Sequence, residues 1–345
     1  MTKASPSHRL VADIGGTNAR AAIATAGAVD LHRIMEREAH SADTVRDLFR
    51  QCMRDAGAGG PIEAALAVAG PVEGDRVTLT NGGWSFSATQ LKQTLGFASV
   101  TVVNDFVGIA LGVPYLDAAD RYAIGGGTAD PQGPIAVLGP GTGLGTAGLA
   151  PSAEGALVVP GEGGHATVSP GNAEESGYID FLRDDALRGD GERWHGHVSA
   201  ERILSGPGMM HLARAIHHAA GVPSPIRTPE DVTRMANAGD ALAVRTVQTF
   251  LAMLGAFAGN LALTFGATGG VYIGGGIVPR LKGLLAGSEF RARFEQKGRL
   301  TDYLRRVPTF LITHQEPALL GLAKMGGLAA GPMLQRPVLA RGYRA

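Results

Sequence analysis

Two stretches of the chain share one order: an apolar strand, a turn of glycines with a threonine, and a second apolar strand. They are LVADIGGTNARAAIAT at residues 10–25 and IAVLGPGTGLGTAGL at residues 135–149. Glycines at such turns let the backbone approach a ligand or another strand closely. The two units start about 130 residues apart, which predicts a duplicated α/β fold rather than a solenoid of short repeats.

The rest of the chain predicts strands that alternate with helices, and two domains. We expect a small domain of residues 1–113 plus about 315–335 and a large domain of residues 114–314. Residues 172–198 are rich in charge and predict a surface excursion. The expected helices cover residues 41–57, the segment after Asp105, a segment capped by Ser205 that ends near Gly221, and about 317–330; strands are expected at 64–70 and 100–105.

Charge and cysteine content exclude several classes of protein. Lys and Arg total 31, as do Asp and Glu, so we expect no nucleic-acid or membrane partner. Cys52 is the single cysteine, which excludes an internal disulfide and a cysteine zinc cluster. The first ten residues lack the apolar core of a signal peptide, so a cytoplasmic protein is expected.

One segment, VQTFLAMLGAFAGNLALTF at residues 247–265, has the length and composition of a membrane span. Gln248, Thr249 and Asn260 interrupt it, and no second span is present. We therefore expect a helix buried inside a large domain.

The opening turn does not match the common nucleotide motifs. A P-loop needs Gly-Lys, which is absent from the chain, and GLGTAG at residues 143–148 is followed by LAPSAEG, which does not predict the helix of a dinucleotide fold. The turn DIGGT instead suits a phosphate-binding hairpin, and Asp13 suits a divalent cation held beside the phosphates. This pattern points to a Mg²⁺-nucleotide, with a plain hairpin as the alternative.

Further motifs carry a family resemblance. They are LAVAGPV from Leu66, LTNGGWSFS from Leu79, NDF at 104–106, GTGLG from Gly141, PGEGGH at 160–165, SAERILSGPG from Ser199 and IGGGIVP from Ile273. With the opening turn, these segments resemble the bacterial glucokinases that lack a zinc motif. The resemblance covers about residues 9–330. It implies a two-domain actin-like ATPase (ribonuclease H-like) fold with a cleft between the domains, ATP and Mg²⁺, a sugar substrate and a homodimer.

The resemblance also assigns roles to individual residues. Asp105 is the catalytic base that takes the proton of the 6-hydroxyl of glucose. The sugar-binding residues are Asn81, Asn104, Asp105, Glu162, His165 and Glu201. The nucleotide-binding residues are Ala12, Asp13, Ile14, Gly15, Gly16, Thr17, Gly141, Thr142, Gly143, Gly275 and Gly276. Asp13 also binds the metal ion.

Other interpretations of these residues remain open. Asp105 could be a helix N-cap, and Glu162 a solvated loop charge. The same fold could phosphorylate another hexose, or could serve as a non-enzymatic actin-like ATPase. A dehydrogenase is disfavoured, because no GxGxxG lies between a strand and a helix.

Overall fold

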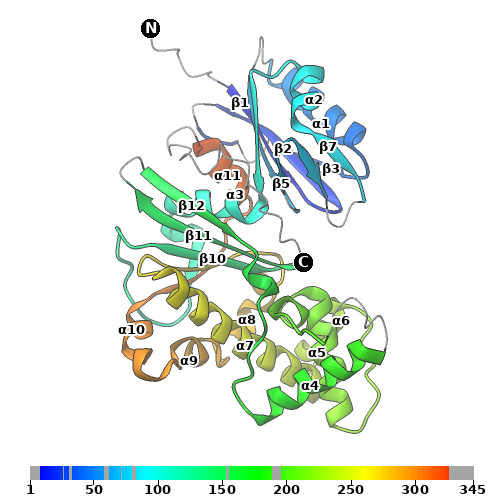
Figure 1. The fold of residues 1–345 in the computed structure, drawn as a ribbon, viewed down its shortest axis with the longest axis vertical. Coiled ribbons are helices and arrows are strands. Elements are labelled where there is room, and N and C mark those ends of the chain that lie inside the picture. Colours follow the sequence, from blue (N-terminus) through cyan, green and yellow to red (C-terminus); the bar gives the residue numbers. More distant parts are fainter. Residues whose placement is uncertain are drawn as a thin grey trace, which may run out of the picture. The chain divides into compact units, whose positions relative to one another are not determined.

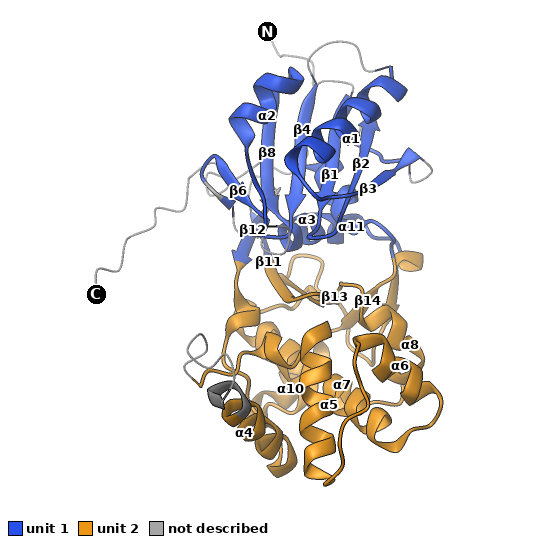
Figure 2. Cartoon of the chain, turned by 90° about the vertical axis from the view of Figure 1, so that its right-hand side faces the viewer, with its two compact units in different colours: residues 1–117, 149–160, 314–345 blue, residues 118–148, 161–313 orange. Residues whose placement is uncertain are grey.

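The structure is a computed structural model that describes residues 8–25, 27–30, 33–57, 62–70, 72–79, 83–152, 155–188 and 196–325. The chain divides into two compact units (Figure 2). Unit 1 holds residues 1–117, 149–160 and 314–345, and unit 2 holds residues 118–148 and 161–313.

Unit 1 is built on a sheet of β3 (Met35–Glu38), β2 (Asn18–Thr25), β1 (His8–Ile14), β4 (Glu63–Val68) and β8 (Ser99–Asn104), in that order; β1, β2 and β3 are labelled in Figure 1 and all five strands in Figure 2. β1 pairs antiparallel with β2, and β2 with β3, whereas β1–β4 and β4–β8 are parallel. The difference follows from the connections: a short glycine turn joins β1 to β2, but the chain passes through a helix between β3 and β4.

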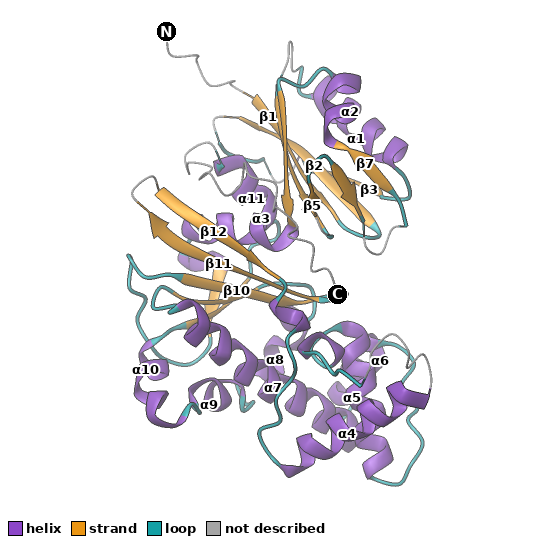
Figure 3. Ribbon diagram, viewed as in Figure 1, coloured by secondary structure: helices purple, strands orange, loops and turns teal. Residues whose placement is uncertain are grey.

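The two faces of β1 have different neighbours because successive side chains point to opposite sides of a strand. Leu10, Ala12 and Ile14 pack in one core with helix α1 (Ala42–Asp55). Asp13 therefore points to the opposite face. On that side β1 contacts α11 (Pro317–Lys324), and α11 contacts α3 (Asp105–Gly112). α1 and α2 (Ala88–Leu95) lie side by side (Figure 3).

Unit 1 also contains a small three-stranded sheet and short connecting helices. The sheet has the order β5 (Val72–Glu73), β6 (Arg76–Thr78) and β7 (Ser85–Ser87). Two 3₁₀ turns, Val113–Tyr115 and Ala118–Asp120, lie where the chain passes from unit 1 to unit 2.

A second sheet has the order β12 (Gly155–Gly161), β11 (Leu144–Ser152), β10 (Ile135–Pro140), β13 (Gly270–Ile273), β14 (Thr309–Ile312) and β9 (Arg121–Ala123). β10–β13 and β13–β14 are parallel, and β14–β9 is antiparallel. Residues 144–152 form a strand rather than a helix, so the expectation that GLGTAG is not a dinucleotide motif is confirmed.

Helix α7 (Ala241–Phe265) is the core helix of unit 2. It contacts α5 (Gly206–Ala219), α6 (Pro229–Asn237) and α9 (Phe290–Glu295). Gly255 and Gly259 permit a close approach, because a Cβ there would lie 2.0 Å from the Phe290 carbonyl oxygen and 2.5 Å from that of Phe294. α7 is the one helix in the described ranges that passes a length-and-composition test for a membrane span, and 56% of its most apolar window is buried in the protein.

The expectation of a surface excursion at residues 172–198 is wrong for its first part. Residues 173–188 form α4 (Ala173–Arg188), whose Tyr178, Ile179 and Leu182 are buried in the core of unit 2. The charge that suggested a loop is partly internal: Glu175 is 2% exposed and pairs with Arg293 through bonds of 2.6 and 2.9 Å. Helix α6 was not expected either, although Thr228 and Asp231 form a capping box at its start.

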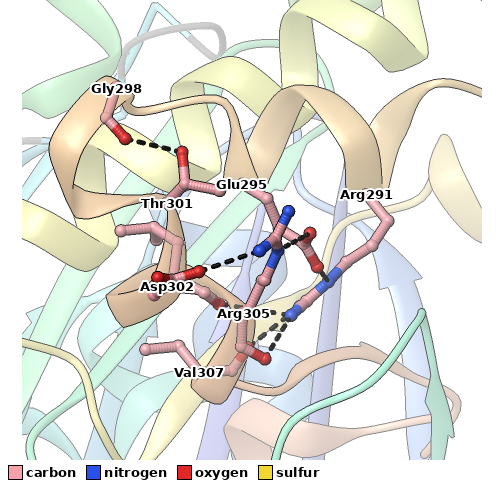
Figure 4. Close-up of polar contacts among 8 residues, drawn as sticks. Arg291, Glu295, Gly298, Thr301, Asp302, Arg305 and Val307 are labelled. Atoms are coloured by element: carbon pink, nitrogen blue, oxygen red, sulfur yellow. Dashed lines mark hydrogen bonds and ion pairs between the residues drawn. The ribbon is translucent and has the colours of Figure 1, made fainter.

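Arg291 fastens the last helices of unit 2 together (Figure 4). α8 (Lys282–Leu285), α10 (Thr301–Arg306) and the 3₁₀ turns Val278–Leu281 and Gly298–Leu300 complete this region. The Arg291 guanidinium donates to Glu295 Oε1 at 2.6 Å, to the Val307 carbonyl at 2.9 Å and to the Leu304 carbonyl at 3.2 Å. Two of these acceptors lie at the end of α10, where the Leu304 carbonyl also accepts from the Val307 N–H at 3.1 Å, so the arginine adds a charged donor to the last turn of that helix.

Candidate active site

The glycine turn between β1 and β2 is a tight hairpin. The Gly15 N–H donates to the Asn18 carbonyl at 2.9 Å, and the Thr17 carbonyl accepts from the Ala39 N–H at 2.6 Å. Thr17 is exposed, and Gly16 is partly so. Ala12 and Ile14 are fully buried, so only their backbone atoms could reach a ligand.

Asp13 lies in a cluster of charges on one face of unit 1. Arg20 is its direct partner across the β1–β2 pair, and Glu36 is the partner of Arg20 across β2–β3. Directly opposed residues of neighbouring strands share a face, so these three side chains form a row. Arg20 contacts Glu36 at 3.3 Å and Glu316, at the start of α11, also at 3.3 Å.

The electrostatics of this row identify Asp13 as unusual. Burial, and then the charge of Asp105, raise the pKa of Asp13 to about 6, although Arg20 opposes the change. Burial and the charge of Asp13 likewise raise the pKa of Glu316 against the attraction of Arg20. The influence of Asp105 on Asp13 means that the two carboxyl groups are near neighbours within unit 1.

Asp105 stands at the junction of β8 and α3. The N-cap of α3 is Asn104, whose Oδ1 accepts from the Phe106 N–H at 2.9 Å, and Asp105 is the first helical residue. Asp105 Oδ1 accepts from the same N–H at 3.0 Å. The alternative interpretation of Asp105 as the N-cap is therefore wrong, and its second carboxylate oxygen is not committed to this bond.

The second and third glycine turns lie together in unit 2. A Cβ on Gly275 would be 2.3 Å from the Pro140 carbonyl oxygen, and φ of Gly275 is +80°, so only glycine suits the position. The Gly141 N–H donates to the Gly143 carbonyl at 2.8 Å, and the Gly141 carbonyl accepts from Gly206, the first residue of α5, at 2.8 Å. Thr142 and Gly276 lie in the same two turns.

Glu201 touches the second glycine turn. Its Oε2 accepts from the Leu144 N–H at 2.8 Å, and a Cβ on Gly143 would meet that oxygen at 2.5 Å. Glu201 lies in the 3₁₀ turn Ala200–Arg202, so the expected sugar-binding acid and the expected phosphate turn are in direct contact.

Glu162 is the N-cap of the 3₁₀ turn Gly163–His165, and His165 is the last residue of that turn. Their side chains are largely exposed, and Glu162 Oε2 lies 3.8 Å from His165 Nε2. Thr146 Oγ1 donates to the Gly161 carbonyl at 3.1 Å and accepts from the Gly163 N–H at 3.0 Å, which fixes the backbone on both sides of Glu162. The segment 161–167 runs beside 198–202 through the bond from the Ala200 N–H to the Ala166 carbonyl at 2.8 Å.

Unit 1 thus brings together Asp13, Asn104 and Asp105, and unit 2 brings together Gly141–Gly143, Glu162, His165, Glu201 and Gly275–Gly276. Asn81 lies outside the described residues. The sequence reasoning missed Arg20, Glu316 and Thr146. A hairpin centred on the glycine turn would have paired Arg20 with Asp13, but no local signal marked Glu316.

The donors near Asp13 suit a cation that keeps most of its water and binds phosphate. Among the described residues no group of three or more His, Cys, Asp or Glu side chains could hold a metal ion. Mg²⁺ in phosphate-transfer sites uses one or two carboxylates, with waters and phosphate oxygens as the remaining ligands. Asp13, whose pKa is raised to about 6 by burial and then by the charge of its neighbour Asp105, fits that role together with Asp105.

Solved structures define the class of protein. A glucokinase from an Antarctic psychrotroph has a TM-score of 0.80 and 36% sequence identity, covering 92% of this chain and 98% of that one. A ROK family glucokinase from Streptomyces griseus, in complex with glucose and AMPPNP, has a TM-score of 0.60 at 19% identity, covering 92% and 98%. The second likeness shows the fold alone. The chain is a sugar kinase with the two-domain actin-like ATPase fold.

Sequence relatives narrow the class. The family model for glucokinase matches residues 10–327. The glucokinase of Nitrobacter hamburgensis is 47% identical over 329 residues, 94% of this chain and 99% of that protein. The glucokinase of Aromatoleum aromaticum is 45% identical, covering 91% of this chain and 93% of that protein. This chain belongs to the glucokinase family.

Some relatives are longer than this chain. The bifunctional protein glk of Burkholderia pseudomallei is 44% identical over 317 residues, which are 91% of this chain but 48% of that protein.

Proposed function

We propose that this glucokinase transfers the γ-phosphoryl group of ATP to the 6-hydroxyl of glucose, with Asp105 as the catalytic base. The support is its position: a carboxylate at the carboxyl end of β8, held by the Phe106 N–H through one oxygen. A carboxylate within hydrogen-bond reach of a hydroxyl orients it and takes its proton, which is worth roughly 10²–10⁴ in rate.

The sugar is held by side chains that can accept from or donate to neighbouring hydroxyl groups. Glu162, His165 and Glu201 come from adjacent segments of unit 2, and their placement suits one small polar ligand. Asn104 and Asn81 would contribute amide groups from unit 1. Charged acceptors such as Glu162 form stronger hydrogen bonds to hydroxyls than neutral ones.

The nucleotide is held by the three glycine turns. N–H groups of Gly15, Gly16 and Thr17 and of Gly141, Thr142 and Gly143 would face the phosphates, and Gly275 and Gly276 would border the nucleoside. In the structure two of these N–H groups, those of Gly15 and Gly141, donate within their own turns, so binding a phosphate requires them to share or exchange that bond. Ala12 and Ile14 would contribute only backbone.

Asp13 would hold Mg²⁺, through water. When bound, the ion neutralises charge that develops on the phosphates during transfer. Arg20, Glu36 and Glu316 keep the Asp13 side chain in a fixed row of charges on one face of the sheet.

The test of the proposal is Asp105→Asn, which keeps the shape of the side chain and removes its basicity. We expect kcat to fall by roughly 10²–10⁴ in a coupled assay with MgATP. Glucose binding, measured by calorimetry, should persist. Turnover close to that of the wild type would refute the role of Asp105 as base.

The substrate itself is tested with a panel of glucose, mannose, fructose and glucosamine. The highest kcat/KM for glucose supports the proposal, and a higher value for another hexose would reassign the enzyme within the same fold. Because Glu162 and His165 are largely exposed, their side chains would also accommodate an epimer of glucose.

We also propose a cytoplasmic homodimer. The equal numbers of acidic and basic residues and the single cysteine support a cytoplasmic enzyme, and the family resemblance supports the dimer. Light scattering on the purified protein should give the mass of two chains. The mass of one chain would refute the dimer without affecting the proposed reaction.

A further inference from the structure

Helix α11 is tied to the central hairpin of unit 1 at both of its ends. At its start, Glu316 Oε1 lies 3.3 Å from Arg20 Nη1 on β2. At its end, Arg9 Nη1 on β1 donates to the Leu322 carbonyl at 3.2 Å. Because Arg9 begins β1 and Arg20 pairs with Asp13 near its end, α11 runs antiparallel to β1, with its first turn beside Asp13.

α11 also contacts α3 without side chains in between. A Cβ on Gly321 would lie 2.1 Å from the Gly108 carbonyl oxygen and 2.6 Å from the Gly112 nitrogen. A Cβ on Gly112 would lie 2.3 Å from the Pro317 carbonyl oxygen. The distance between the two helices is thus set by backbone against backbone, which has no rotamer to change and little room to compress.

This contact bears on the catalytic residue because α3 is short. Asp105 is its first residue, and Gly108 lies within its first turn. A helix of eight residues moves nearly as one body, so a displacement at Gly108 or Gly112 reaches the Asp105 carboxylate. Another neighbour of α3, strand β4, presents Ala67, whose methyl group would lie 3.2 Å from a Cβ on Gly108 and limits movement on that side.

We propose that Gly321 is a positioning residue for Asp105. Because Gly321 has no side chain, α11 can lie close against α3, and this distance between the two helices places the Asp105 carboxylate for catalysis. The inference rests on the proposed role of Asp105. Arg20 and Arg9 fix the position of α11 along β1. The close contact at Gly321 then fixes the position of α3 relative to α11. Misplacing a catalytic group by 1 Å can cost about 100-fold in rate.

The test is a series of glycine-to-alanine variants in which the loss of activity is compared with how closely the new Cβ approaches its neighbours. Gly321→Ala and Gly112→Ala each drive a methyl group into backbone and should lower kcat per nucleotide-binding site by about 10- to 100-fold. Gly108→Ala meets the methyl groups of Ala67 and Ala318 at 3.2 and 3.4 Å and the Ala318 Cα at 3.7 Å, which are looser contacts, so it should lose less activity. Gly177→Ala, in α4 with no atom within 4 Å of the new Cβ, is the control and should lose nothing.

Two further measurements separate positioning from loss of folded protein. Calorimetry with a non-hydrolysable ATP analogue and Mg²⁺ gives the fraction of sites that can bind nucleotide. The dissociation constant of the analogue should be the same in every variant as in the wild type. Crystal structures of Gly321→Ala and Gly108→Ala should show Asp105 displaced relative to β8, more in the first. If Gly321→Ala does not fold, Gly108→Ala carries the test alone.

Failure of the inference and failure of the proposed function are distinguishable. If the wild-type protein does not phosphorylate glucose, the proposed function is refuted. The crystal structures of the variants still test whether Gly321 positions Asp105. The positioning is overturned if Asp105 keeps its wild-type place in these variants, or if kcat per site is unchanged.

Discussion

Asp13→Asn should make the protein more stable at high pH while it disables the enzyme. The folded protein raises the pKa of Asp13 from 3.8 to about 6, first by burial and then by the charge of Asp105. A raised carboxyl pKa means that the folded state binds the proton more tightly than the unfolded chain does. The stability that this group contributes is therefore lost as pH rises between 3.8 and about 6. Above pH 6 the ionised side chain of Asp13 destabilises the folded state.

The size of the effect follows from the two pKa values. The interval from 3.8 to about 6 corresponds to ~3 kcal/mol, at about 1.4 kcal/mol for each pH unit. Because Asp13 is partly exposed, solvent screening makes ~3 kcal/mol an upper limit. We expect Asp13→Asn to raise the free energy of unfolding by ~1–3 kcal/mol at pH 8. At pH 5 the folded wild type is already largely protonated, and the gain should fall to about half.

The assay uses urea unfolding of the protein without nucleotide, followed by fluorescence. The chain has two tryptophans, so a Trp194→Phe background leaves Trp84, which packs on the core of unit 1 and donates to the Ala39 carbonyl at 2.7 Å. Asp47→Asn, an exposed acid of α1 paired with Arg50, is the control and should destabilise slightly at both pH values. A variant at Asp13 that is less stable than the wild type at pH 8, or equally changed at pH 5 and 8, would refute the electrostatic reasoning.

Three further predictions concern unit 2. Gly275→Ala, at φ +80° and with its Cβ 2.3 Å from the Pro140 carbonyl oxygen, should cost ~1–3 kcal/mol of stability and raise KM for ATP but not for glucose; equal rises in steady-state assays would contradict this. Glu162→Gln should raise KM for glucose about 10-fold, and an unchanged KM would remove Glu162 from the sugar site. Arg293→Met leaves the carboxylate of Glu175 buried without its partner and should cost ~3–5 kcal/mol in urea unfolding, partly recovered by adding Glu175→Gln; no recovery would argue against a charge effect.

The local elements were largely predictable because their signals are local. The apolar runs on either side of the glycine turn at residues 15–16 predict the hairpin, and Ser205 predicts the start of α5. The apolar segment at residues 247–265 predicts the helix and its end, although α7 begins six residues earlier, at Ala241. In each case a few neighbouring residues decide the backbone, so the chain alone is sufficient.

Two of the misses, α4 and Glu316, have one physical cause: the deciding partner is distant in sequence. The charged residues of α4 suggested a loop because Arg293, 118 positions after Glu175, is what makes burial of that acid tolerable. Glu316 gains its place beside Arg20 only when the end of the chain returns to unit 1. The roles of Asp105, Glu162, His165 and Glu201 came from the family resemblance, since a carboxylate in a glycine loop has no local mark of catalysis.

The close approach of α7 and α9 has a consequence for protein synthesis. α7 leaves the ribosome before residues 290–294, whose carbonyls will later lie against Gly255 and Gly259. Until then the face of α7 that carries these two glycines lacks the helix that covers it, although α5 and α6, which also contact α7, precede it in the chain. The core around α7 is therefore closed on this face only after α9 has been synthesised.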